Sequence, residues 1–159
     1  MLVSVCALGL LLSAGTAGGA DPTLQIFESE EVGLLGEIKT AKCKVKRLSN
    51  GIRTFHAAGK TTNRAYKLDV DIRDFRGFDR EYEIHYGDLR TVVGLEGAGA
   101  DYSSVYPFPG TPPGSAGAIA LNRRGSKMGL GMYALPNSDY SEGVALAGGM
   151  RCKYRRGAP

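Results

Sequence analysis

Alternation between apolar and polar side chains sets the strongest limit on what this chain can fold into. In Tyr66–Arg73 every second residue is apolar, and the residues between them are charged. Successive side chains of a β-strand point to opposite faces, so this pattern predicts a strand with one buried face. Ala41–Arg47 and Glu81–Tyr86 repeat it, whereas the 3.6-residue period of an amphipathic helix does not recur. The sequence therefore predicts a mostly β protein.

Turn-forming residues separate these segments and indicate how the strands are connected. Ser49-Asn50-Gly51 follows the first alternating segment and has the composition of a hairpin turn. Short strands separated by frequent turns are typical of an antiparallel β-sandwich or a barrel-like single domain. Residues 97–117 are rich in Gly and Pro, which predicts a loop region there.

The first 20 residues have the composition of a secretory signal peptide. Met1–Ala20 contains no charged side chain, and Leu2–Leu12 is almost entirely apolar before a run of small residues. The apolar run of about 11 residues is shorter than the roughly 20 that a membrane-spanning helix needs. We therefore expect a signal peptide at 1–20 and a secreted β-domain at 21–159. That domain would be extracellular or periplasmic, without a transmembrane segment.

Two of the three cysteines lie in the predicted mature chain. Cys6 falls within the signal peptide, which leaves Cys43 and Cys152. In an oxidising compartment such a pair predicts one disulfide, although two buried free thiols are the alternative. The bridge would close a loop of 110 residues, for which chain entropy gives roughly 4 to 5 kcal/mol of stabilisation. Disulfide geometry requires the two cysteine strands to be neighbours in a sheet or to face each other across the core.

Charge is unevenly distributed along the mature chain, although the net charge is only +4. Residues 21–37 form an acidic lead-in segment with five acids and no base, and Ile38–Lys60 holds seven bases and no acid. Both cysteine strands alternate cysteine with base. If they are neighbours, their bases merge on one outward face, a candidate anion-binding face of Lys42, Lys44, Lys46, Arg151, Lys153 and Arg155. Alternatively, these bases keep the sheet soluble and are balanced by cross-strand acids.

Residues that could support catalysis or metal binding are sparse. His56 and His85 are the only histidines, and their spacing predicts no transition-metal site. Asp69 and Asp71 lie on the polar phase of a strand, which is unlike a calcium loop. No serine has the sequence context of an activated nucleophile. We therefore predict no catalytic residues, no metal and no cofactor; a histidine within hydrogen-bond reach of Ser, Asp or Glu in a pocket would favour an enzyme.

These patterns predict an exported, non-enzymatic interaction or structural protein, secreted or associated with the cell envelope. One alternative is a binder of anionic envelope polymers through the basic strands, with acidic polysaccharide or lipid headgroups as further anionic partners. A second alternative is a small secreted hydrolase whose site the sequence does not identify. Export makes nucleic acid an unexpected partner.

Overall fold

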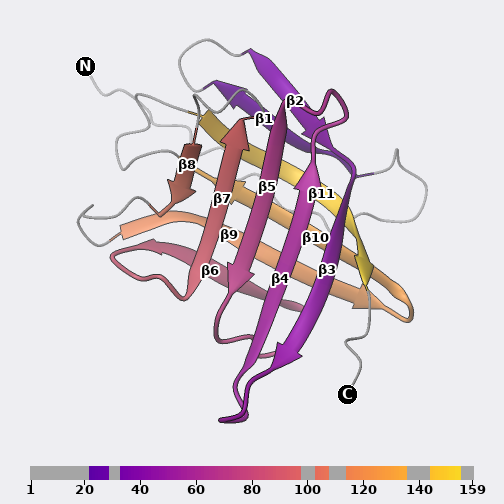
Figure 1. Cartoon of the computed structure of the whole chain (residues 1–159), viewed down its shortest axis with the longest axis vertical. Coiled ribbons are helices and arrows are strands. Elements are labelled where there is room, and N and C mark those ends of the chain that lie inside the picture. The colour runs from indigo at the N-terminus through magenta and orange to yellow at the C-terminus, as the bar shows by residue number, and fades with distance from the viewer. Residues whose placement is uncertain (1–21, 29–32, 98–102, 108–113, 136–143, 155–159) are drawn as a thin grey trace, which may run out of the picture.

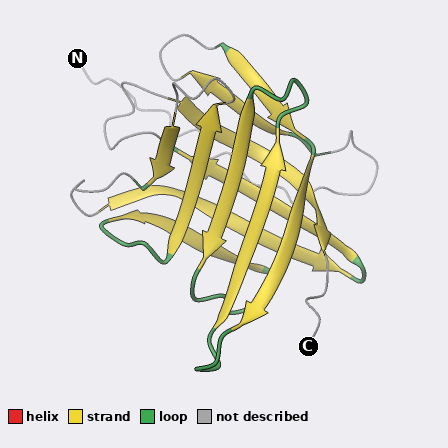
Figure 2. Cartoon of the chain, in the orientation of Figure 1, coloured by secondary structure: helices red, strands yellow, loops and turns green. Residues whose placement is uncertain are grey.

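All regular structure in the described part of the chain is β-strand (Figures 1 and 2). The computed structural model describes residues 22–28, 33–97, 103–107, 114–135 and 144–154. The eleven strands are β1 (Leu24–Glu28), β2 (Leu34–Ile38), β3 (Thr40–Arg47), β4 (Arg53–Lys60), β5 (Tyr66–Ile72), β6 (Arg80–Tyr86), β7 (Thr91–Gly97), β8 (Ser103–Tyr106), β9 (Gly114–Arg124), β10 (Lys127–Ala134) and β11 (Val144–Tyr154). No described segment forms a helix of the length and apolar character needed to span a bilayer.

The strands form a nearly closed, barrel-like sheet, as the sequence predicts. Its order is β6-β9-β10-β11-β3-β4-β5-β7-β8, and β1 pairs with both β11 and β2. In Figure 1, β3, β4, β5 and β7 form a front layer that crosses β6, β9 and β10 behind it. The described strands of the two layers are joined by the β11–β3 ladder, while β6 and β7 approach each other without pairing.

Side chains along the strands alternate between buried and exposed, so apolar residues fill the interior and charged residues lie outside. In β5, Leu68, Val70 and Ile72 are buried, whereas Lys67 and Asp69 are exposed. A cluster of aromatic rings adds to the core where the chain leaves β5, with ring centroids 5.1 to 6.0 Å apart. Its members are Phe55, Phe75, Phe78 and Tyr82. Burial of these apolar surfaces is the main stabilising contribution to such a fold.

The predicted disulfide between Cys43 and Cys152 is confirmed, and it joins neighbouring strands. β3 and β11 pair in parallel, with Ala41 opposite Cys152 and Cys43 opposite Tyr154. The two cysteines are therefore diagonal neighbours, and their Cα atoms lie 5.5 Å apart. This is the one parallel pair among the described strands; every other ladder is antiparallel, as expected. The bridge thus clamps a ladder of only four residue pairs.

The Gly- and Pro-rich region 97–117 is described only in part, at 97, 103–107 and 114–117. Ser103–Tyr106 forms β8 against β7, and β9 already begins at Gly114. Gly117 lies within β9 and has φ +145°, a conformation that side-chain-bearing residues rarely adopt. The signal peptide prediction at 1–20 lies outside the described residues. The acidic segment 21–37 contains β1 and the first residues of β2.

Candidate anion-binding face

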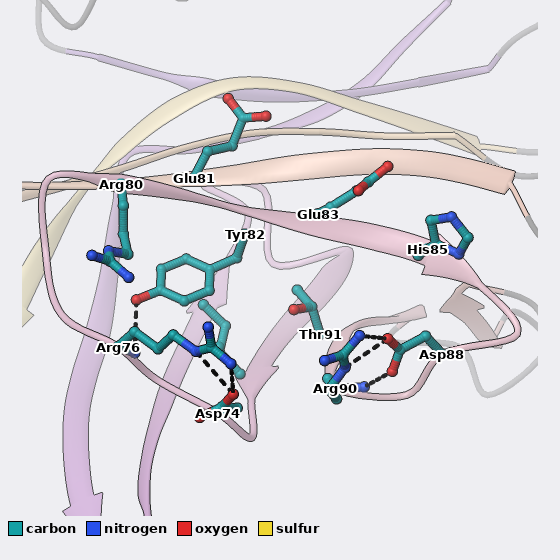
Figure 3. Close-up of a pocket in the computed structure, with 11 residues that line it drawn as sticks. Asp74, Arg76, Arg80, Glu81, Tyr82, Glu83, His85, Asp88, Arg90 and Thr91 are labelled. Atoms are coloured by element: carbon teal, nitrogen blue, oxygen red, sulfur yellow. Dashed lines mark hydrogen bonds and ion pairs between the residues drawn. The ribbon is translucent and has the colours of Figure 1, made fainter.

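A groove of about 500 Å³ lies where β6 faces β7, and its charges are largely paired within it (Figure 3). Arg76 Nη2 lies 2.8 Å from Asp74 Oδ2, and Arg90 Nε lies 2.7 Å from Asp88 Oδ2. The Tyr82 hydroxyl accepts a hydrogen bond from the Arg76 backbone N–H, and burial raises its pKa. Because opposite charges neutralise each other here, the groove presents no concentrated charge to a ligand.

The Asp88–Arg90 pair gives a pH-dependent prediction for the turn after β6. Hydrogen bonds from the Arg90 side chain and backbone hold the pKa of Asp88 below its ordinary value of 3.8. A lowered folded pKa stabilises the protein above that ordinary value, and the contribution is lost as pH falls through the folded pKa. We expect Asp88→Asn to be slightly less stable than wild type in urea at pH 7. The difference should close below pH 3.8; a difference that persisted unchanged there would contradict the assignment.

A smaller hollow of about 250 Å³ lies over the strands that carry the disulfide, and lysines line it. Lys42 on β3 is directly opposite Lys153 on β11, and Lys44 is opposite His56 on β4. All three lysines are exposed, while the intervening Cys43 is buried. The structure therefore brings the bases of the two cysteine strands onto one outward face.

The cationic surface continues across two further strands. The antiparallel β10–β11 ladder ends with Met128 opposite Cys152, and Lys127 and Lys153 are the residues immediately beyond this last pair. Lys127 is in turn opposite Arg124 on β9. Four exposed cations thus lie side by side on four neighbouring strands, in the order Arg124, Lys127, Lys153 and Lys42, which we call the basic row. With strands ~4.8 Å apart, the row spans ~14 Å.

No acid neutralises this row within the described residues. None of its four members has a described carboxylate oxygen within 4.0 Å. Asp79 Oδ1 accepts a hydrogen bond from the backbone N–H of Arg123, next to Arg124, at 3.1 Å, but forms no ion pair with the row. On the other side, Asp69 and Asp71 on β5 lie against His56. Like charges on adjacent strands repel, so a bound anion would relieve a destabilising arrangement.

His56 meets the condition that would favour an enzyme, because it lines the hollow and lies within hydrogen-bond distance of an aspartate. Its Nδ1 lies 2.8 Å from Asp71 Oδ1, as an oriented catalytic base would require. However, its Nε2 faces Asp69 Oδ1 at 3.6 Å, where a nucleophile would have to lie. Among the described residues, no hydroxyl or free thiol lies within hydrogen-bond distance of either ring nitrogen, and no group of His, Cys, Asp and Glu side chains could hold a metal ion.

The predicted site residues fall into three groups. Lys42, Lys44 and Lys153 line the hollow. Lys46 and Arg151 are exposed on the same face, with Lys46 opposite Thr54 and Arg151 opposite Thr40. Arg155 lies outside the described residues. The sequence analysis missed Arg124 and Lys127, because only the β9–β10–β11 pairing brings this turn beside Lys153.

Comparison with known proteins adds no identity to this description. No family model, no curated protein and no solved structure matches the chain.

Proposed function

We propose that the chain is an exported, non-enzymatic interaction domain that binds a polyanion across the basic row. The observation that carries this proposal is the register that places four cations on consecutive strands, none of them with a described carboxylate oxygen within 4.0 Å. Charges arranged in this way raise the local concentration of an anionic ligand and speed its association. Lysine side chains are long and flexible, so they can follow successive charges of a polymer without a preformed pocket.

The class of polyanion follows from where the chain would act. A disulfide that clamps two strands fits an oxidising compartment, and the apolar segment at 1–20 is the signal that would deliver the chain there. The anions of such a compartment are acidic polysaccharides, phosphate-rich envelope polymers and lipid headgroups. Nucleic acid is not the expected ligand.

Replacing three members of the basic row should weaken binding to heparin, which serves as a soluble probe polyanion. Each Lys or Arg near an anionic surface contributes about 1 kcal/mol. The combined substitution Lys42→Gln, Lys127→Gln and Lys153→Gln should therefore lower affinity by about 100-fold. Calorimetry or a fluorescence titration at fixed salt would measure the change. Affinity of the wild-type protein should also fall steeply as salt rises.

A matched control removes the same number of charges elsewhere. Arg64→Gln, Arg73→Gln and Arg80→Gln change exposed bases outside the basic row that, like its members, have no described carboxylate oxygen within 4.0 Å. We expect this triple variant to lose less than about 5-fold, because its remaining effect is only long-range and screened. Equal losses in both triple variants, or binding that ignores salt, would contradict a specific cationic site.

A further inference from the structure

The turn between β3 and β4 presents two large apolar side chains to solvent. Leu48 is 45% exposed and Ile52 is 44% exposed. Figure 1 shows this hairpin projecting beyond the other described strands. Other exposed large apolar residues occur elsewhere in the described chain, but these two share a single turn. The two residues therefore place apolar side chains at the projecting end of this hairpin.

The turn holds these two side chains in a fixed relation. Leu48 N–H donates to the Ile52 carbonyl at 2.7 Å, and Gly51 N–H donates to the Leu48 carbonyl at 2.9 Å. Asn50 Oδ1 accepts from Ile52 N–H at 3.1 Å, and Gly51 has φ +85°, which favours glycine. Leu48 and Ile52 therefore form the last opposed pair of the hairpin and share one face.

That face is the one that carries the lysines. In β3 the outward residues alternate as Lys42, Lys44 and Lys46, and Leu48 continues the same phase. Across the hairpin, Lys46 is opposite Thr54, and Ile52 continues the outward phase of β4. A surface that meets the end of the hairpin would therefore contact the apolar pair first and the lysines next.

Two arginines at the base of the turn add charge without acidic partners. Arg47 and Arg53 are directly opposite each other, an arrangement of like charges that costs stability. Among the described residues, no carboxylate oxygen lies within 4.0 Å of either guanidinium. Arg53 instead lies over the Phe75 ring, 5.4 Å from its centroid. The hairpin end thus combines an apolar pair with unbalanced positive charge.

We infer that the hairpin end, defined as Lys46–Arg53, docks on an anionic lipid bilayer. Leu48 and Ile52 would enter the boundary between headgroups and acyl chains, while Lys46 on the same face would contact headgroup phosphates; Arg47 and Arg53, on the opposite phase of the hairpin, would add to its attraction for the anionic surface. A hydrophilic polysaccharide offers charge but no apolar medium for the two side chains, so the observations favour a lipid surface. The inference rests on the proposed function in one respect: it identifies the polyanion of the basic face as a membrane.

The test uses the full oxidised chain and vesicles of two compositions. Vesicles of phosphatidylcholine and phosphatidylglycerol in equal parts should bind the wild-type protein, whereas pure phosphatidylcholine should not, because two apolar side chains alone are a weak anchor. The combined change Leu48→Ser and Ile52→Ser should reduce binding to the anionic vesicles by about 10-fold or more. The matched control Leu34→Ser and Leu89→Ser removes apolar side chains that are 57% and 50% exposed elsewhere, and should bind as wild type.

A spectroscopic readout locates the contact directly. The chain contains no tryptophan, so Leu48→Trp introduces a single reporter. Its emission should shift to the blue on anionic vesicles, while the reporter in a Leu89→Trp variant should not shift.

Heparin binding separates the two proposals. If the serine pair keeps full vesicle binding, or the Leu48→Trp reporter does not shift on vesicles that bind the protein, membrane docking by the hairpin is wrong while polyanion binding stands. If the serine pair weakens heparin binding as strongly as vesicle binding, the turn belongs to a polymer site and the inference is overturned. If wild type binds neither probe, both proposals are wrong.

Discussion

Removing the disulfide with the pair Cys43→Ala and Cys152→Ala is expected to lower the free energy of unfolding by about 5 kcal/mol. The two cysteines are 109 positions apart, so the bridge restricts most of the unfolded chain. In the folded state it clamps a parallel ladder of four residue pairs. That ladder joins the described strands of the front and back layers, and on the far side β6 and β7 do not pair. Without the bridge, the sheet can open along β3 and β11.

Urea unfolding followed by circular dichroism would measure this loss. Wild-type protein unfolded with and without reductant provides the control, because the reductant breaks the disulfide while both cysteine side chains remain. The alanine pair should lose slightly more than reduced wild type, since Cys43 and Cys152 are buried and their side chains contribute to packing. A loss below about 1.5 kcal/mol in both cases would show that the bridge does not set the stability of the sheet.

Gly117→Ala should lower the free energy of unfolding by about 3 kcal/mol or more. Gly117 lies in β9 opposite Ala134 of β10, with φ +145°. A Cβ at this position would lie 2.0 Å from the Tyr133 carbonyl oxygen and 2.9 Å from Ala134 Cα. Both contacts are with backbone, so no side-chain rotation can relieve them. The β9–β10 pairing would have to distort.

Gly129→Ala provides the matched control on the partner strand. A Cβ there meets nothing within 4 Å, so we expect a change of less than about 1 kcal/mol, including a slight gain from reduced entropy of the unfolded chain. Hydrogen exchange should show faster opening of β9 and β10 in Gly117→Ala alone. Similar unfolding curves for the two variants would contradict the close approach of Gly117 to β10.

Local periodicity predicts the strands of this protein well where one face is buried and the other is charged. Tyr66–Ile72 is the clearest case, since each outward residue is polar and each inward residue from Leu68 on is buried. It predicts less well in β9, where small residues such as Ala116, Ala118 and Gly117 give no alternation of size or polarity. There the strand depends on close backbone packing with β6 and β10, which the local sequence does not encode.

The candidate site was likewise predictable from local sequence only in part. Alternation alone places Lys42 and Lys44 opposite in phase to Cys43, and a disulfide limits how far Lys153 can lie from them. The choice between neighbouring and facing strands requires the tertiary structure, because both arrangements satisfy the geometry of a disulfide. Arg124 and Lys127 join the row through a chain of two ladders, and no local pattern reports which strands those ladders connect.

Cysteine and lysine occupy alternate positions on the two clamped strands, so fold closure and assembly of the cationic surface are a single event. Before the disulfide forms, no covalent bond holds Lys42 beside Lys153, and the basic row is divided between strands that can separate. If the proposed function is correct, a reduced chain would bind polyanions less tightly than the oxidised one, and formation of the disulfide would complete the binding surface.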